Sequence, residues 1–136
     1  MNKILIVKTS WYEDHISKMF GISKEILGKE FKCLDAVAPG ALELSALASH
    51  KISTSDHEYK GIIFLGIVIR GETSHYDLVT QQAYRSIGTF AYTFQMKAVI
   101  NNVICVENIE QLEARLVKNT TKNAKALIKL INEKSS

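Results

Sequence analysis

The sequence predicts an α/β fold in which helices cover both faces of a four-stranded parallel sheet. Four apolar, strand-like runs alternate along the chain with four segments of helical pattern. Strands that alternate with helices pair in parallel, through right-handed crossovers. The run Gly61–Ile69 is nearly all apolar, as a central parallel strand covered on both faces should be. With 136 residues the chain is near the commonest domain size, so we expect one domain over residues 1–136.

The first strand and helix are expected between Lys3 and Leu27. Lys3–Lys8 is the strand. Ser10 and Glu13 then have capping-box spacing, with the hydroxyl at the cap and the carboxylate three residues later. The positions that follow continue at helical period up to Leu27: Ile16, Met19, Phe20, Ser23 and Ile26.

The second strand and helix lie on either side of a Pro-Gly step. Phe31–Ala38 is the strand, and Pro39 and Gly40 end it. Pro is well tolerated in the first turn of a helix, and Ala41–His50 is a short segment of good helix formers. Lys51–Lys60 is polar and irregular, and we expect it to be a loop.

The second half of the chain repeats this order. Gly61–Ile69 is the third strand, and Ser74–Asp77 again has cap spacing for a long helix that runs towards Thr93. Ala98–Val106 is the fourth strand, and Asn108 opens a last helical region. Near the end of that region, apolar residues recur at i, i+3, i+4 and i+7: Ala124, Leu127, Ile128 and Ile131.

Composition argues against several classes of protein. No apolar run approaches the roughly 18 residues that suggest a membrane span, and the N-terminus lacks the apolar core and cleavage pattern of a signal peptide. The net charge of +3 is weak support for nucleic-acid binding, because the lysines of residues 118–134 fit a solvated helix face better. We therefore expect neither a membrane nor a nucleic-acid partner.

The two cysteines predict a reduced, cytoplasmic protein. Cys33 and Cys105 sit in apolar runs, and neither has a second Cys or His at metal-ligand spacing. We expect buried thiols, with no disulfide framework and no metal site.

Chemistry-bearing residues follow three of the four predicted strands. Trp11 follows the first strand, Ala41–Glu43 the second and Glu72–His75 the third. Because the carboxyl ends of parallel strands lie at one edge of a sheet, these residues should converge there. The edge would carry an aromatic ring, a carboxylate, two hydroxyls and an imidazole beside the N–H groups of a helix start, which favour phosphate. Such a set can bind a flat heterocycle and a phosphate together, with His75 as a proton shuttle.

Each of these residues also has a purely structural interpretation. A histidine at a helix start is often a surface residue without a role. Thr73 and Ser74 are good helix caps, and Trp11 alone is typical of a core or an interface. The charged residues, taken singly, fit solvated helix positions or structural ion pairs: Glu43, Arg70, Arg115 and Lys122. Spacing alone therefore names no reaction.

Three motifs, in order along the chain, resemble a known enzyme family. Gly66–Asp77 (GIVIRGETSHYD) closely resembles the signature of 6,7-dimethyl-8-ribityllumazine synthases, which catalyse the penultimate step of riboflavin synthesis. Pro39–Leu44 (PGALEL) resembles the second motif of that family, usually Pro-Gly-Ala-Phe-Glu. Asn108–Gln111, followed by Arg115, resembles the third. The similarity runs from the first strand to the last helix.

The resemblance implies a fold, an assembly and a reaction. The fold is a flavodoxin-like αβα sandwich. The chains assemble into homopentamers, in some members into a hollow icosahedral 60-mer of twelve pentamers, and association with riboflavin synthase is a further implied partnership. The reaction condenses 5-amino-6-(D-ribitylamino)uracil with 3,4-dihydroxy-2-butanone 4-phosphate. An amine attacks the ketone to give an imine, phosphate is eliminated, and the ring closes with loss of water. Neither a metal nor an organic cofactor is implied.

The resemblance also implies roles for residues at the matching positions. His75 would be the general acid/base, and Glu72 and Thr73 would hold the phosphate. Arg115 of a neighbouring subunit would supply the opposing charge, with Lys122 matching a family lysine across a gap. The residues around the ribitylaminouracil would be Trp11, stacked on the ring, Ala41, Leu42 and Glu43 on the ribityl chain, and Ile67, Val68 and Ile69 at the ring pocket.

Two departures from the family pattern motivate an alternative function. Leu42 replaces the usual Phe, and Asn101 stands where the family commonly has a Phe that covers the pyrimidine from the next subunit. Loss of a stacking aromatic costs about 1–3 kcal/mol of binding. The alternatives are a homologue that binds ribityl heterocycles or flavins with weak catalysis, and a mostly structural shell protein.

Overall fold

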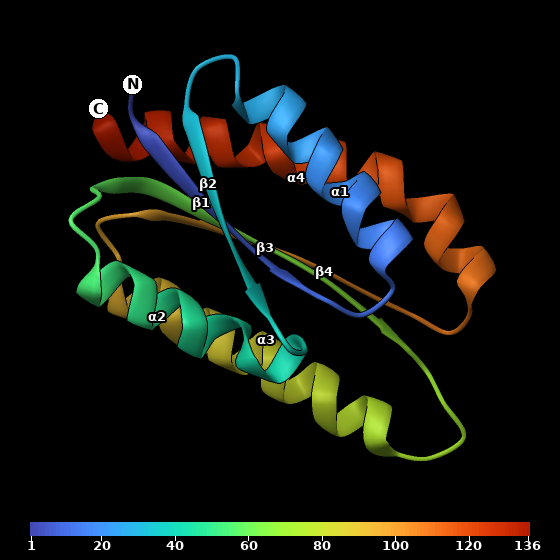
Figure 1. The fold of residues 1–136 in the computed structure, drawn as a ribbon. Helices are drawn as coiled ribbons and strands as arrows, with labels where there is room; N and C mark the ends of the chain where they lie inside the picture. The colour runs from blue at the N-terminus through green and yellow to red at the C-terminus, as the bar shows by residue number, and fades with distance from the viewer.

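A four-stranded parallel sheet lies between two pairs of helices (Figure 1). The computed structural model describes residues 1–136. The strands are β1 (Lys3–Thr9), β2 (Lys32–Ala38), β3 (Tyr59–Ile69) and β4 (Ala98–Val106), in the order β2-β1-β3-β4. This is the order of the first four strands of a flavodoxin-like sheet. The predicted α/β class and the parallel sheet are therefore confirmed.

The helices cover both faces of the sheet. They are α1 (Glu13–Leu27), α2 (Leu44–Thr54), α3 (His75–Thr93) and α4 (Ile109–Ser135), and a short 3₁₀ helix, η1 (Ala41–Glu43), precedes α2. Figure 1 shows α1 and α4 on one face of the sheet and α2 and α3 on the other. None of the helices combines the length with the apolar sequence that a membrane span requires.

The nearly all-apolar sequence of β3 has a direct structural reason. Successive side chains of a strand point to opposite faces, so a central strand needs apolar residues at every position. Ile63, Leu65 and Ile67 pack in the core under α1 and α4. Ile62 and Phe64 pack in the second core, under α2 and α3. The strand thereby joins the two layers of the molecule.

A glycine allows α4 to approach the sheet closely. A Cβ at Gly61 would lie 2.9 Å from Cδ1 of Leu127 and 3.0 Å from Cδ1 of Ile131. Of the predicted apolar stripe on α4, Ala124, Leu127 and Ile131 are buried, and Ile128 is half-buried beside them. The lysines on the other side of this helix are exposed, as the sequence predicts.

The start of α1 differs from the prediction. The N-cap is Tyr12, in a left-handed conformation (φ 57°, ψ 55°), and no side chain caps the helix. Ser10 instead binds the end of β2: its N–H donates to the carbonyl of Ala38, and its hydroxyl to the carbonyl of Pro39. The predicted cap at Ser10 was wrong because strand-end contacts hold that residue outside the helix.

Two further boundaries differ from the prediction. The loop expected over residues 51–60 is shorter: α2 runs to Thr54 and β3 starts at Tyr59, so only residues 55–58 lie between them. At α3, the predicted side-chain cap from Ser74 is absent, and Thr73 accepts a hydrogen bond from the His75 N–H instead. The cap at Asn108 is present, because its side chain accepts from the Gln111 N–H at 2.9 Å.

The cysteines are free but only half-buried. Cys33 lies on β2 and Cys105 on β4, the two edge strands, where side chains have fewer neighbours than in the centre. Burial still raises the pKa of both thiols above the ordinary value. The expectation of free thiols is confirmed, and that of full burial was wrong.

Candidate active site

Residues from the ends of three strands line one cavity at the carboxyl edge of the sheet. Its volume is about 330 Å³. The lining residues are Trp11, Tyr12, Gly40, Ala41, Leu42, Glu43, Ile67, Val68, Ile69, His75 and Val79. The convergence expected from the parallel order therefore occurs.

The segment after β1 supplies an exposed aromatic wall. The side chain of Trp11 is 67% exposed, although a large aromatic ring usually buries itself. The left-handed turn at Tyr12 separates this residue from α1. A Cβ at Gly40 would be in ordinary van der Waals contact with the indole, 3.8 Å from its Nε1, so this glycine lies beside the ring. An exposed, flat indole can stack on a planar ligand.

The segment after β2 forms the second wall. Leu44 is fully buried and anchors the short helix η1, while Leu42 and Glu43 are exposed. The carboxylate of Glu43 turns back towards Gly40: its Oε1 lies 3.2 Å from where a Cβ at that position would stand. This wall therefore offers an apolar surface beside a hydrogen-bond acceptor.

The end of β3 extends beyond its neighbour β1. The β1–β3 register ends where Lys8 lies opposite Leu65. Residues 67–69 pair only with residues 104–106 of β4. Backbone groups of this segment that point to the β1 side are thus without a strand partner. They can bind a flat heterocycle edge-on, as a further strand would.

His75 stands at the junction of the turn and α3. Its backbone N–H donates to Thr73 Oγ1 at 3.2 Å, and its side chain is exposed. The imidazole makes no hydrogen bond within the chain, and the residue lines the cavity. An imidazole in this position is free to transfer protons to and from a ligand.

The neighbouring Arg70 does not line the cavity. Its guanidinium donates to Glu107 through Nε and to Asp77 through Nη2 (3.3 Å), and it lies 4.4 Å from the centre of the Tyr76 ring. The hydrogen bond with Glu107 is the largest cause of the raised pKa of Arg70. Pairing with a carboxylate was the structural alternative for this residue, and it is confirmed.

Several predicted site residues lie outside the cavity. Glu72 and Thr73 are exposed in the turn just before His75. Asn101 lies on the edge strand β4, opposite Phe64, and its Oδ1 accepts from the Val103 N–H. Arg115 and Lys122 are exposed on α4 and do not line this cavity. No lysine or arginine is among the residues that line it.

Three lining residues were not predicted from the sequence. Val79 lies one helical turn after His75 on α3, so the helical period would have found it. Gly40 belongs to the Pro-Gly motif, but no pattern in the neighbouring sequence indicates that it lies beside the indole of Trp11. Tyr12 lines the cavity and has a left-handed conformation, which nothing in the sequence indicates.

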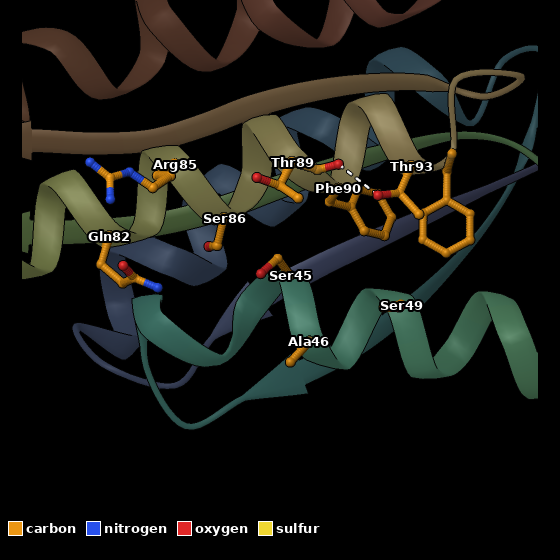
Figure 2. A pocket seen from close by; sticks show the side chains of 10 residues that line it. Ser45, Ala46, Ser49, Gln82, Arg85, Ser86, Thr89, Phe90 and Thr93 are labelled. Carbon is orange, nitrogen blue, oxygen red and sulfur yellow. Dashed lines mark hydrogen bonds between the residues drawn. The ribbon is translucent and has the colours of Figure 1, made fainter.

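A second hollow, of about 360 Å³, lies between α2 and α3. Most of its lining side chains carry a hydroxyl or an amide, and Figure 2 shows Arg85 at one end with Phe90 towards the other. It contains no carboxylate, imidazole or thiol, so it offers no group for acid/base chemistry near neutral pH. Nowhere in the chain do three or more His, Cys, Asp or Glu side chains cluster in a way that could hold a metal ion.

Comparison with known proteins identifies the family of the chain. A family model described as 6,7-dimethyl-8-ribityllumazine synthase matches residues 1–135. A protein of Rhizobium meliloti named 6,7-dimethyl-8-ribityllumazine synthase 1 is 37% identical over 116 residues, which are 82% of this chain and 75% of that protein. Synthases of the same name from Agrobacterium fabrum (33%) and Zymomonas mobilis (34%) match 83% and 85% of this chain, and 78% and 81% of their own lengths. The chain belongs to the 6,7-dimethyl-8-ribityllumazine synthase family.

Proposed function

We propose that this protein condenses 5-amino-6-(D-ribitylamino)uracil with 3,4-dihydroxy-2-butanone 4-phosphate to 6,7-dimethyl-8-ribityllumazine, as a transferase of riboflavin biosynthesis. Family membership supports the reaction. The observation that carries it is the shared cavity of Trp11 and His75, because the reaction needs a surface for a flat pyrimidine and a proton carrier beside it. No step requires a metal or an organic cofactor.

His75 would move the protons of this reaction. The pyrimidine amine attacks the ketone carbon, and the carbinolamine needs a proton on its hydroxyl to leave as water and form the imine. Removal of a carbon-bound proton then expels phosphate, and ring closure releases a second water. Each step transfers a proton near one point, which suits a single imidazole that alternates between acid and base.

The pyrimidine substrate fits the three walls of the cavity. Its ring would stack on Trp11, and its polar edge would bind the unpaired backbone groups of Ile67, Val68 and Ile69. The ribityl hydroxyls would lie along Ala41, Leu42 and Glu43, where the carboxylate can accept hydrogen bonds. Hydroxyl groups recognised in this way give strong discrimination against analogues that lack them.

The phosphate would bind the turn before α3, and its counter-charge would come from another copy of the chain. Glu72 would contribute its backbone N–H and Thr73 its N–H or hydroxyl, beside the positive end of the α3 dipole. No basic side chain lines the cavity, and Arg70 is already bound by two carboxylates. Arg115 of a neighbouring subunit, with Lys122 and Asn101, would complete the site in a homopentamer.

One assay tests the function and its alternative together. The purified protein is incubated with both substrates while lumazine absorbance and released phosphate are followed, and sedimentation gives the size of the assembly. Product and phosphate in equal amounts, from a particle of five or more chains, are expected. Tight binding of the pyrimidine without product would instead favour a ribityl-heterocycle binder, which Leu42 and Asn101 make the natural second candidate. A large assembly with neither binding nor product would identify a shell protein, and co-sedimentation would reveal any association with riboflavin synthase.

A further inference from the structure

Arg70 joins two turns that lie at the same edge of the sheet. The first turn, residues 70–74, connects β3 to α3, and the second connects β4 to α4 (Figure 1). From the first turn, the guanidinium reaches Glu107 in the second and Asp77 in the first turn of α3. The ring of Tyr76 lies against it. The backbone N–H of Arg70 also donates to the Val106 carbonyl at 2.9 Å, which fixes the base of the side chain.

Little else holds the turn between Arg70 and α3. Its residues 71–74 are all exposed. The hydrogen bond from the His75 N–H to Thr73 and two backbone bonds to the Ser74 carbonyl are its other local contacts. The position of this turn relative to the sheet therefore depends on Arg70. This residue precedes the turn, and its guanidinium binds Asp77, which follows the turn in α3.

The far anchor of Arg70 is itself fixed. The backbone N–H of Glu107 donates to Gln111 Oε1 at 2.8 Å, and the Gln111 N–H donates to the cap residue Asn108 at 2.9 Å. Glu107 is thus held against the first turn of α4. A guanidinium between two carboxylates, with an aromatic ring on one face, is an arrangement that only arginine can make.

We propose that Arg70 is a positioning residue of the lumazine synthase reaction, which sets the turn 71–74 and the imidazole of His75 at the distance from the sheet that the phosphate-bearing substrate requires. This inference rests on the proposed function. Arg70 acts through Asp77 and Glu107 and does not itself contact the substrate. Because exposed ion pairs contribute little to stability, its effect falls on catalysis rather than on folding.

The test is the substitution Arg70→Lys, which keeps the charge but removes the planar fork. We expect kcat to fall by roughly ten- to a hundredfold, as for other small misplacements of reacting groups. The KM for the butanone phosphate should rise, while the KM for the pyrimidine stays constant because Trp11 and residues 67–69 are untouched. The melting temperature should change little. Unchanged kinetics in this variant would overturn the proposal.

A double variant separates positioning from direct phosphate binding. In Asp77→Ala/Glu107→Ala the guanidinium loses both of its acceptors, whereas the isosteric amides would still accept its hydrogen bonds. If Arg70 positions the turn, this variant should repeat the losses of Arg70→Lys. If Arg70 bound phosphate directly, its release would lower the KM for the butanone phosphate, and that result would overturn the proposal. The double variant also keeps the test intact if Arg70→Lys does not fold.

A control is the ion pair between Lys8 and Asp35, whose carboxylate is about as exposed as those of Asp77 and Glu107 but which lies on β1 and β2. Asp35→Asn should leave all kinetic constants unchanged, and equal losses there would show that any surface ion pair matters, against the proposal. Failure of the proposed function would be seen separately, as absence of lumazine from the unmodified protein.

Discussion

The indole of Trp11 and the imidazole of His75 line one cavity, although the first follows β1 and the second begins α3. The two residues meet because β1 and β3 are neighbours in the parallel sheet, so their carboxyl ends open to the same edge. A ring stacked on the indole would therefore lie beside the proton carrier. The two residues should have separable effects, one on affinity and one on turnover.

Replacement of the imidazole should abolish turnover without unfolding the protein. We expect His75→Ala to lower kcat by about 10²–10⁴-fold, the usual contribution of general acid/base catalysis. Its melting temperature should stay close to that of the unmodified protein, because the side chain is exposed and makes no hydrogen bond within the chain. Steady-state kinetics and circular dichroism melting measure the two effects. His50→Ala, on the exposed side of α2, is the control, and a His75→Ala protein with normal turnover would remove the proton-transfer role.

Replacement of the indole should weaken binding of the pyrimidine. Trp11→Ala is expected to lose about 1–3 kcal/mol of binding free energy, and Trp11→Phe much less, because a smaller ring still stacks. Trp11 is the sole tryptophan of the chain, so quenching of its fluorescence by the pyrimidine reports binding to the unmodified protein directly. Calorimetric titration gives the affinity of the variants. Tyr92→Ala, an exposed aromatic outside the cavity, should bind normally. Equal affinities for Trp11→Ala and the unmodified protein would exclude stacking.

The sequence predicts the strands and the edge where the site forms because these follow from local pattern. Apolar runs of strand length mark the sheet, and the alternation with helices makes it parallel. The residues after each strand must then meet. Helix and strand boundaries were less predictable: α2 continues through residues 51–54, where Ile52 packs against the second core between polar, exposed neighbours.

Features that depend on contacts between distant segments could not be predicted. The left-handed turn at Tyr12 comes two residues after Ser10, which hydrogen bonds to the distant end of β2 hold outside α1. Two adjacent asparagines, Asn101 and Asn102, interrupt the apolar strand β4, and only the packing of α4 supplies the partners of the buried Asn102. The residues proposed to act from a neighbouring subunit, such as Arg115, lie outside the cavity of their own chain.

The buried hydrogen bonds of the Asn102 amide lead to a prediction about stability. This residue is 2% exposed, and its Nδ2 donates to the fully buried hydroxyl of Thr120 at 3.0 Å, while its Oδ1 accepts from Asn123 at 2.7 Å. Thr120→Val keeps the shape but leaves a buried donor without a partner, which should cost about 1–3 kcal/mol of unfolding free energy. Thr120→Ser keeps the hydroxyl and should cost less. Urea unfolding measures both, and a Thr120→Val protein as stable as the unmodified one would contradict this role of the hydrogen bond.

The phenol of Tyr84 predicts a stability difference that depends on pH. Its hydroxyl donates to the Val103 carbonyl at 2.7 Å, and partial burial against β4 raises the pKa of Tyr84 well above its ordinary value of about 10. Well below a pH of about 10, the phenol is neutral in both the folded and the unfolded chain, so its contribution to the free energy of unfolding does not change with pH. Above it, the unfolded chain loses the proton first, and the folded state loses stability as the pH rises.

The variant Tyr84→Phe isolates this effect. At neutral pH it should be less stable than the unmodified protein by about 0.5–1.5 kcal/mol, the net value of one hydrogen bond. The difference should shrink as the pH rises past about 10, because phenylalanine has no proton to lose in the unfolded state. Urea unfolding at a series of alkaline pH values measures the gap. Tyr92→Phe, whose ring is 85% exposed, should show no comparable trend. A gap that widens with pH would mean that the folded state favours the ionised phenol, contrary to the contact with a carbonyl oxygen.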